Sequence, residues 1–232
     1  APTLGSEERD YYTTNPSGWK APVGISAIPS LDDKWWVMDS RNHRVRGVDP
    51  TTGTFGLSNH AGDGVLGFVD GPMARFRNNR GLSTAGSGEI YVADRGNNAV
   101  RKVLADNSVL TVAGTGNATE AAWNAVDGVG VLASFHNLYD LQIDASDAYL
   151  YIADRFNDAI RLMDVSTGLV TTLSAPTLIG QDPCYISVSG AGVVNVADYN
   201  NNMVHVFGAV PVAALTASPA TPPAPFVSET AG

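Results

Sequence analysis

Short apolar runs, rich in β-branched and aromatic residues, recur along the chain and alternate with polar turn residues. Four segments align with one another: WWVMDSRNHRVRGV from Trp35, IYVADRGNNAVRKV from Ile90, LYIADRFNDAIRLM from Leu150 and VNVADYNNNMVHVF from Val194. Their apolar runs are too short for helices and have the composition of strands. The Asp-x-x-Asn between two runs favours a turn, because both side chains can hydrogen-bond to nearby backbone. Each segment therefore predicts a β-hairpin.

The four hairpins share polar columns at fixed spacing. An Asp ends the first apolar run, an Asn follows three positions later, and an Arg or His stands at position seven. The members are Asp39, Asn42 and Arg46; Asp94, Asn97 and Arg101; Asp154, Asn157 and Arg161; and Asp198, Asn201 and His205. We interpret the columns as structural: the Asp caps the turn, the Asn tolerates a left-handed backbone, and the Arg pairs with a carboxylate. No motif brings an acid, a base and a nucleophile together, so the hairpins predict no catalytic site.

Further strands flank each hairpin. They are expected upstream at 23–27, 81–84, 138–143 and 184–188, and downstream at 54–57, 109–113 and 169–173. About four strands per unit, with Asp-to-Asp spacings of 55, 60 and 44 residues, are typical of propeller blades. The fold class predicted is all-β: a β-propeller of four antiparallel four-stranded blades over residues 22–212. Segment 1–21 and the Pro-, Ala-, Thr- and Ser-rich segment 213–232 are expected to be extended.

Two inter-blade loops also resemble each other, Gly67 to Asn78 and Ala125 to Asn137. Hairpin motif, loop and spacing together resemble the NHL-repeat β-propeller family over most of the chain. The resemblance implies a propeller that usually has six blades, whereas four complete blades are present in this sequence. A closed four-bladed ring, an open arc and a piece of a longer propeller all remain open at this point.

Charge disfavours two classes of partner. The chain has 14 Lys and Arg against 23 Asp and Glu, a net charge of −9, which opposes binding to a phosphate backbone or an anionic membrane. Some NHL propellers bind RNA through a basic surface, and Arg residues do gather in the first third of this chain. They are Arg41, Arg44, Arg46, Arg75, Arg77 and Arg80. Because interleaved aromatic residues are lacking, we expect no nucleic-acid partner. The most apolar stretch, 209–217, is about half of a membrane span, so no membrane insertion is expected.

No cofactor is expected either. The related peptide-amidating lyases hold zinc with histidines, but no two of His43, His60, His136 and His205 stand at metal-ligand spacing. Asp63-Gly64 and Asp70-Gly71 place oxygens in a Gly-rich loop without the regular spacing of a calcium loop. The single cysteine, Cys184, excludes an intrachain disulfide and has the apolar flanks of a packing residue.

The ends and one loop carry weaker candidate sites. Asn117 begins the sequon Asn-Ala-Thr, and Thr216, Ser218 and Thr221 lie in a segment with the composition of an O-glycosylated stalk. An exposed strand edge can accept an extended segment of another copy. Phe226 and Val227 are the apolar anchors expected in that contact.

The function predicted is a non-enzymatic structural or interaction module, located extracellularly or at the cell surface. We expect it to be a protomer of a larger homo-oligomeric or filamentous assembly that is held together by its extended termini. Its expected partners are other copies of itself or other proteins, with glycans as possible modifications. The chain begins with Ala-Pro-Thr, as a mature protein does after removal of a signal peptide. Two alternatives stay open: an enzyme of the lyase or lactonase type, which would place metal ligands in a central channel, and a ligand-binding receptor ectodomain fragment.

Overall fold

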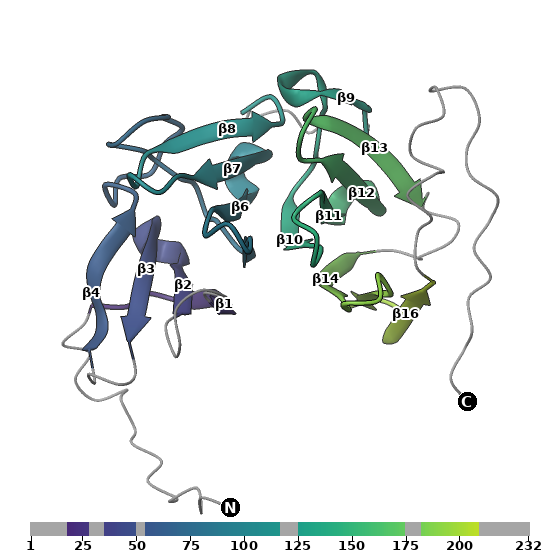
Figure 1. Ribbon diagram of the computed structural model, residues 1–232, viewed down its shortest axis with the longest axis horizontal. Coiled ribbons are helices and arrows are strands. Elements are labelled where there is room, and N and C mark those ends of the chain that lie inside the picture. Colours follow the sequence, from purple (N-terminus) through teal and green to yellow (C-terminus); the bar gives the residue numbers. More distant parts are fainter. Residues whose placement is uncertain (1–17, 28–34, 50–53, 117–124, 175–181, 209–232) are drawn as a thin grey trace, which may run out of the picture.

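The computed structural model describes residues 18–27, 35–49, 54–116, 125–174 and 182–208. These residues form four antiparallel sheets that follow one another along an arc (Figure 1). The first sheet contains β1 (Pro22–Ala27), β2 (Trp35–Asp39), β3 (Arg44–Asp49) and β4 (Thr54–Ala61). The second contains β5 (Leu82–Thr84), β6 (Ile90–Asp94), β7 (Ala99–Val103) and β8 (Val109–Ala113). The predicted all-β propeller of four blades is confirmed.

The third and fourth sheets depart from the predicted four strands. The third contains β10 (Leu138–Ile143), β11 (Tyr149–Asp154), β12 (Ala159–Asp164) and β13 (Leu169–Ser174), with β9 (Gly128–Val129) as a fifth strand at its outer edge. The fourth contains only β14 (Pro183–Val188), β15 (Val194–Asp198) and β16 (Met203–Phe207) among the described residues. No described helix is long and apolar enough to cross a membrane.

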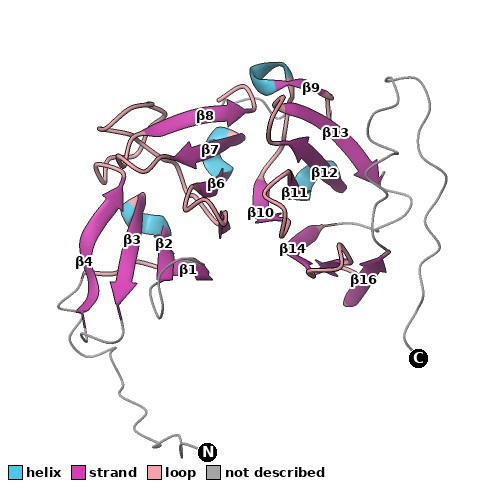
Figure 2. Cartoon of the chain, in the orientation of Figure 1, coloured by secondary structure: helices cyan, strands magenta, loops and turns pink. Residues whose placement is uncertain are grey.

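The two central strands of the first three sheets are joined by three-residue 3-10 turns: η1 (Ser40–Asn42), η2 (Arg95–Asn97) and η4 (Arg155–Asn157). Figure 2 shows these turns as short coils within an otherwise all-strand molecule. A further 3-10 turn, η3 (Gly130–Leu132), follows β9. The residue after each hairpin turn is left-handed, with φ of 55° at His43, 51° at Asn98 and 49° at Asp158. The left-handed position is therefore the residue after the motif Asn, and our assignment of it to the Asn itself was wrong.

Apolar side chains pack between neighbouring sheets. Because side chains alternate across a strand, each sheet presents one set of residues to the sheet before it and another to the sheet after it. Met38 and Val45 of the first sheet pack with Leu82, Ile90 and Val92 of the second. Similar clusters join the second sheet to the third and the third to the fourth. The first strands of successive sheets also contact one another, which places β1, β5, β10 and β14 on the inside of the arc.

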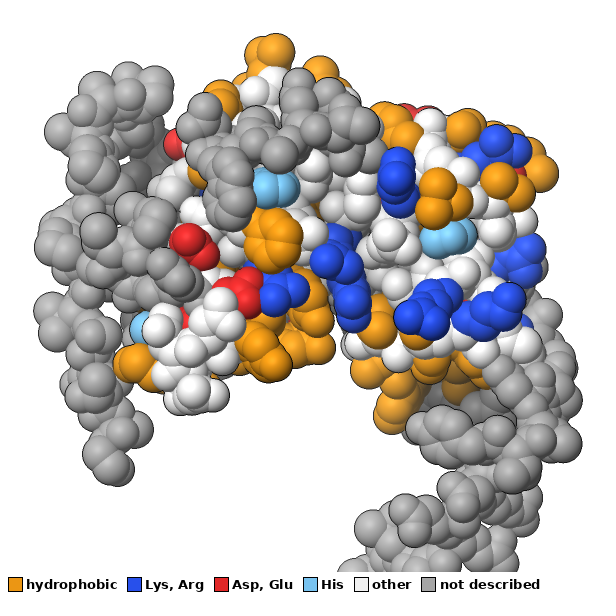
Figure 3. Space-filling model, turned by 180° about the vertical axis from the view of Figure 1, so that it is seen from behind, with side chains coloured by type: hydrophobic (Ala, Val, Ile, Leu, Met, Phe, Trp, Pro, Cys, Tyr) orange, Lys and Arg blue, Asp and Glu red, His pale blue; other side chains and the backbone are white. Residues whose placement is uncertain are grey.

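The arc does not close on itself. The first and fourth sheets lie at its two ends (Figure 1), and the space-filling view shows open space between them (Figure 3). The described residues therefore form an open arc and not a closed four-bladed ring. Each end presents a sheet face that has no further sheet of the described residues packed against it.

Candidate functional site

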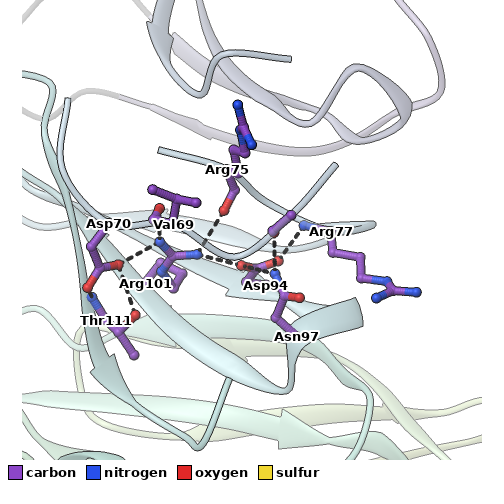
Figure 4. A network of polar contacts seen from close by, with 9 residues as sticks. Val69, Asp70, Arg75, Arg77, Asp94, Asn97, Arg101 and Thr111 are labelled. Carbon is purple, nitrogen blue, oxygen red and sulfur yellow. Dashed lines mark hydrogen bonds and ion pairs between the residues drawn. The ribbon is translucent and has the colours of Figure 1, made fainter. Parts of the chain in front are cut away.

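The repeated Asp, Asn and Arg residues form a buried polar network inside each blade. In the second blade, Asp94 accepts hydrogen bonds from Asn97 Nδ2 at 2.8 Å and from Arg101 Nη1 at 2.7 Å. Its other oxygen accepts one from the Arg77 backbone N–H at 2.8 Å, and Figure 4 shows these contacts converging on one carboxylate. Asp94 and Arg101 are fully buried. Asp94 thus binds both the Arg101 side chain and the backbone of the segment that leads into its own blade. It does not cap the 3-10 turn, because its side chain makes no cap hydrogen bond there.

The inter-blade loops supply a second carboxylate to the same Arg. Asp70 accepts from Arg101 Nη2 at 2.6 Å and from Thr111 Oγ1 at 2.9 Å. Asp127 repeats this arrangement one blade later, accepting from Arg161 Nη2 at 3.0 Å and from Thr172 Oγ1 at 2.8 Å. Gly71 pairs with Val109 as an isolated bridge, just as β9 pairs with β13. Each loop is therefore fastened to the outer strand of the blade that follows it.

Aromatic rings cover the buried guanidinium groups. Arg101 lies 5.3 Å from the ring centroid of Phe76, and Arg161 lies 5.2 Å from that of Phe135. In the first blade the equivalent ring is Trp19, 4.4 Å from Arg46. Sequence reasoning did not single out Trp19, although its position before β1 matches that of Phe76 before β5.

The fourth copy of the network is weaker. His205 Nε2 lies 3.1 Å from Asp198, and Asn201 donates to the same carboxylate at 2.9 Å. A His in place of Arg can contribute the contact as a neutral ring, so this blade does not require a buried ion pair.

Burial dominates the ionisation of the network. It raises the pKa of Asp94 to about 6, although Arg101 and the Asn97 amide lower it. It also raises the pKa of Asp154, against the opposing effects of Arg161 and Asn157. Burial also raises the pKa of Asp140 on β10, to about 7, against hydrogen bonds from the Ile186 and Leu141 N–H groups. Asp140 was not predicted from sequence, because its burial depends on Gly81 of the second sheet and Ile186 of the fourth.

The other candidate residues occupy separate places. His60 stacks on Trp36, with 3.9 Å between ring centroids, and His136 packs edge-on against Phe156. His43 follows η1, and burial lowers its pKa. Across the described part of the chain, no group of three or more His, Cys, Asp or Glu residues is arranged to hold a metal ion.

The calcium-loop candidates contact protein donors instead. Asp63 pairs with Arg75 at 2.7 Å and accepts from the Val65 N–H, while Asp70 belongs to the Arg101 network. Arg46 is buried, and Arg44 donates to the Asp63 carbonyl at 2.9 Å. Cys184 is buried, and burial raises the pKa of its thiol.

Several predicted sites lie outside the described residues. They are the glycosylation candidates Asn117, Thr216, Ser218 and Thr221, and the assembly contacts Phe226 and Val227.

The two ends of the arc expose residues whose counterparts are buried in the interior blades. On the fourth sheet, Val204 is 65% exposed, whereas Val45, Val100 and Ile160 at the same repeat position are 0%, 0% and 2% exposed. Val206 and Tyr185 are exposed on the same side. We call Tyr185, Val204 and Val206 the trailing face.

The first sheet shows the converse pattern. Ile25 is 58% exposed, whereas its counterparts Leu82, Leu141 and Ile186 are at most 6% exposed. Trp35 is exposed as well, while the equivalent Ile90 is fully buried. We call Ile25, Trp35 and the half-buried Val37 the leading face. At each of the three junctions between sheets, the face of one sheet that corresponds to the trailing face packs on the face of the next sheet that corresponds to the leading face.

Comparisons with known proteins agree with the repeat. The NHL repeat-containing protein 2 of Bos taurus is 31% identical over 152 residues, which cover 57% of this chain and 21% of that protein. The chain folds as a four-bladed β-propeller whose repeats are similar to NHL repeats. The chloroplastic protein SUPPRESSOR OF QUENCHING 1 of Arabidopsis thaliana is 27% identical over 180 residues, covering 74% of this chain and 16% of that protein. No family model matches.

Solved structures show the same fold at low identity. This NHL-like propeller matches a protein of unknown function from Bacteroides thetaiotaomicron with a TM-score of 0.63 and 17% identity, covering 80% of this chain and 46% of that one. An auxiliary nutrient binding protein from Bacteroides ovatus gives 0.62 and 15%, with coverage of 81% and 48%. A chain of the nidogen–laminin complex gives 0.57 and 16%, with coverage of 83% and 61%.

The chain spans less than a quarter of the curated relatives and about half of the first two solved chains.

Proposed function

We propose that this NHL-like propeller is a non-enzymatic extracellular building block that associates head to tail with copies of itself through its trailing and leading faces. The observation that supports this most directly is the reversal of exposure at repeat-equivalent positions, with Val204 at 65% against 0% for Val100. A valine side chain stabilises a protein by about 1.5 kcal/mol or more when it is fully buried. The two faces therefore gain free energy when they are covered.

A second copy is the occupant that the internal junctions favour. The trailing face of each interior sheet already packs on the leading face of the next, so the trailing face of one copy suits the leading face of another. Contact surfaces that differ in this way are heterologous, and they propagate head to tail or close as a ring. The two faces of one molecule lie at opposite ends of the open arc and do not meet (Figure 1).

Polar contacts at the internal junctions define the register expected between copies. Asn98 Oδ1 accepts from the Asn137 N–H at 2.8 Å, and Asp158 Oδ1 accepts from the Asp182 N–H at 2.8 Å. The equivalent acceptor on the trailing end is Asn202, which is left-handed and exposed. The equivalent donor on the leading end is the N–H of Ala21, whose φ of 49° matches that of its counterparts. Asn202 of one copy is expected to bond with Ala21 of the next.

Sedimentation velocity over a concentration series tests the proposal. Wild-type protein should self-associate at micromolar concentration, whereas Val204→Glu and Ile25→Glu should each sediment as monomers. An equimolar mixture of the two variants should form a dimer, because one intact face of each kind remains. Val131→Glu is the matched control, since Val131 is 61% exposed on η3 away from both faces.

Two results would refute head-to-tail association. The first is a wild-type chain that stays monomeric at about 100 μM, with covering blades then supplied by a longer polypeptide. The second is a mixture of the two variants that fails to dimerise although each variant alone is folded by circular dichroism. Extracellular location remains a prediction, tested by the glycan and leader content of the native protein.

A further inference from the structure

Residues that differ between blades gather at the inner ends of the second, third and fourth blades. One repeat position near the start of each blade's first strand is Val23 in the first blade. The same position is Arg80 in the second blade, Tyr139 in the third and Cys184 in the fourth. Gly81, Asp140 and Tyr185 occupy the next position. A blade-building role requires the same residue type in every copy, as the Asp and Asn columns show. The first position differs in all four blades. The second is Gly in the first two blades, Gly24 and Gly81, but Asp or Tyr in the last two, so the repeat does not explain these residues.

Two guanidinium groups lie against the Tyr139 ring, and a third contacts the nearby Asn137. Arg80 lies 5.0 Å from the ring centroid and Arg155 lies 4.9 Å from it. Arg95 extends from η2 to the neighbouring Asn137, whose side-chain oxygen it contacts at 2.6 Å. Burial lowers the pKa of Arg95, and the positive charges of Arg80 and Arg155 lower it further.

Only one carboxylate contacts these cations within the described chain. Asp182 pairs with Arg155 through both of its oxygens. The acceptor of Arg95 is a neutral amide. Arg80 donates its backbone N–H to the Ala93 carbonyl, but its side chain makes no described hydrogen bond or ion pair, and its Nε is buried without a partner. The neighbouring Asp140 carboxyl accepts from the Ile186 N–H at 3.2 Å, and no arginine side chain is among its described partners. Two of the three positive charges therefore lack a counter-charge in the described chain.

Aromatic surface borders the same cluster. Tyr185 packs edge-on against Tyr139 with 5.4 Å between ring centroids, and it is 54% exposed. Figure 3 shows Lys and Arg side chains running from the middle of the molecule across the first two sheets. A ligand at the cluster would thus meet both positive charge and the edge of a ring.

We propose that Arg80, Arg95 and Arg155, arranged round Tyr139 on the inside of the arc, form a binding site for a small organic or inorganic oxyanion bearing two or more carboxylate or phosphate oxygens. Guanidinium groups bind such oxyanions through charge-assisted hydrogen bonds that are stronger than neutral ones. Arg80 and Arg155 each lie within 5.0 Å of the centroid of the same ring, so an anion with several oxygens is needed to contact both. The bound anion would supply the counter-charge that the described chain does not provide and would relieve the repulsion among the three cations.

Thermal unfolding and isothermal titration calorimetry test the site with citrate and inorganic phosphate as separate probes. Each probe is compared with sodium chloride at equal ionic strength, so that general screening is subtracted. At least one probe should raise the unfolding temperature more than the chloride does. A response to citrate alone assigns a carboxylate ligand, and a response to phosphate alone assigns a phosphate ligand.

The decisive variant is Arg80→Gln, which removes a guanidinium that holds no described carboxylate. It should lower the affinity about tenfold or more. Arg41→Gln is the matched control, because Arg41 is exposed on η1 and its described contact is through the backbone; this variant should bind like the wild type.

Three outcomes would overturn the proposal. In the first, neither probe exceeds chloride. In the second, Arg80→Gln binds within twofold of the wild type. In the third, Arg80→Gln and Arg41→Gln lose affinity equally. The last outcome, with a single-stranded oligonucleotide binding better than either small anion, would indicate a diffuse basic surface instead of a built site.

Discussion

Replacing Asp94 by Ala should destabilise the propeller far more than loss of a surface turn residue. The side chains of Asp94 and Arg101 are both fully buried and 2.7 Å apart. Removing one member of a buried pair leaves an uncompensated charge and typically costs about 3–5 kcal/mol. Arg101 keeps its contacts with Asp70 and with the Val69 and Arg75 carbonyls, so we expect the lower end of that range. This exceeds the roughly 0.5–2 kcal/mol of a lost turn or cap.

The repeat supplies its own control for this prediction. Asp198 occupies the same position in the fourth blade, but its partner is His205, which can remain as a neutral ring. Asp198→Ala should therefore cost only about 1 kcal/mol, the typical value of a hydrogen bond. Urea unfolding followed by tryptophan fluorescence measures both, with the midpoints compared at constant slope.

A double variant separates charge from packing. Asp94→Leu combined with Arg101→Met removes both charges and keeps apolar bulk, and it should recover at least half of the loss caused by Asp94→Ala. The argument is refuted if Asp94→Ala costs no more than Asp198→Ala, because loss of the buried one of the two carboxylate partners of Arg101 would then carry no extra penalty.

Three further predictions follow from the packing between sheets. The raised pKa of Asp140, about 7 in the folded protein, means that the folded state holds this proton more tightly than the unfolded chain, whose value is about 3.9. Its contribution to stability is complete below about pH 4 and is lost as the pH rises through about 7, so Asp140→Asn should flatten the dependence of the urea midpoint on pH over this interval. Val100→Ala should cost about 2 kcal/mol in equilibrium unfolding through lost burial, while Val204→Ala in monomeric protein should change stability by less than about 0.5 kcal/mol. Gly81→Ala should lower the melting temperature markedly, since a Cβ there would collide with the Asp140 carboxyl and Cα, whereas Gly190→Ala meets nothing within 4 Å and should not; equal effects of the two would contradict this packing.

The strands were predictable because each one is a short apolar run within a repeat. The predicted range 138–143 coincides with β10, and the predicted range 109–113 coincides with β8. β4 extends to Ala61, four residues beyond the prediction, because Ser58 and Asn59 continue the ladder opposite Gly47 and Arg46 without any apolar signal. β9 was missed for a related reason, since two residues of a loop form a strand only through their pairing with β13.

The candidate site was less predictable because it depends on contacts between blades. The repeat motif alone places Asp94 and Arg101 in one hairpin. It does not show that Asp70, from the preceding loop, lies beside them. The exposure of Val204 is also invisible in the sequence, where it occupies the same column as Val100. Arg80 was noted only as one member of a basic run, and its proximity to Arg95 and Arg155 arises from the curvature of the arc.

The attachment of each inter-blade loop to the outer strand of the following blade defines the unit in which this protein is built. A segment that starts at the loop and ends at the outer strand contains the buried arginine and both aspartates that pair with it. It also contains both strands of the pairing that attaches the loop. Such a unit can be copied or removed whole without breaking a buried ion pair, whereas a cut between Asp127 and Arg161 separates the pair. Tandem duplication would therefore change the length of the arc one complete blade at a time, and engineered truncations should place their ends just before the loops.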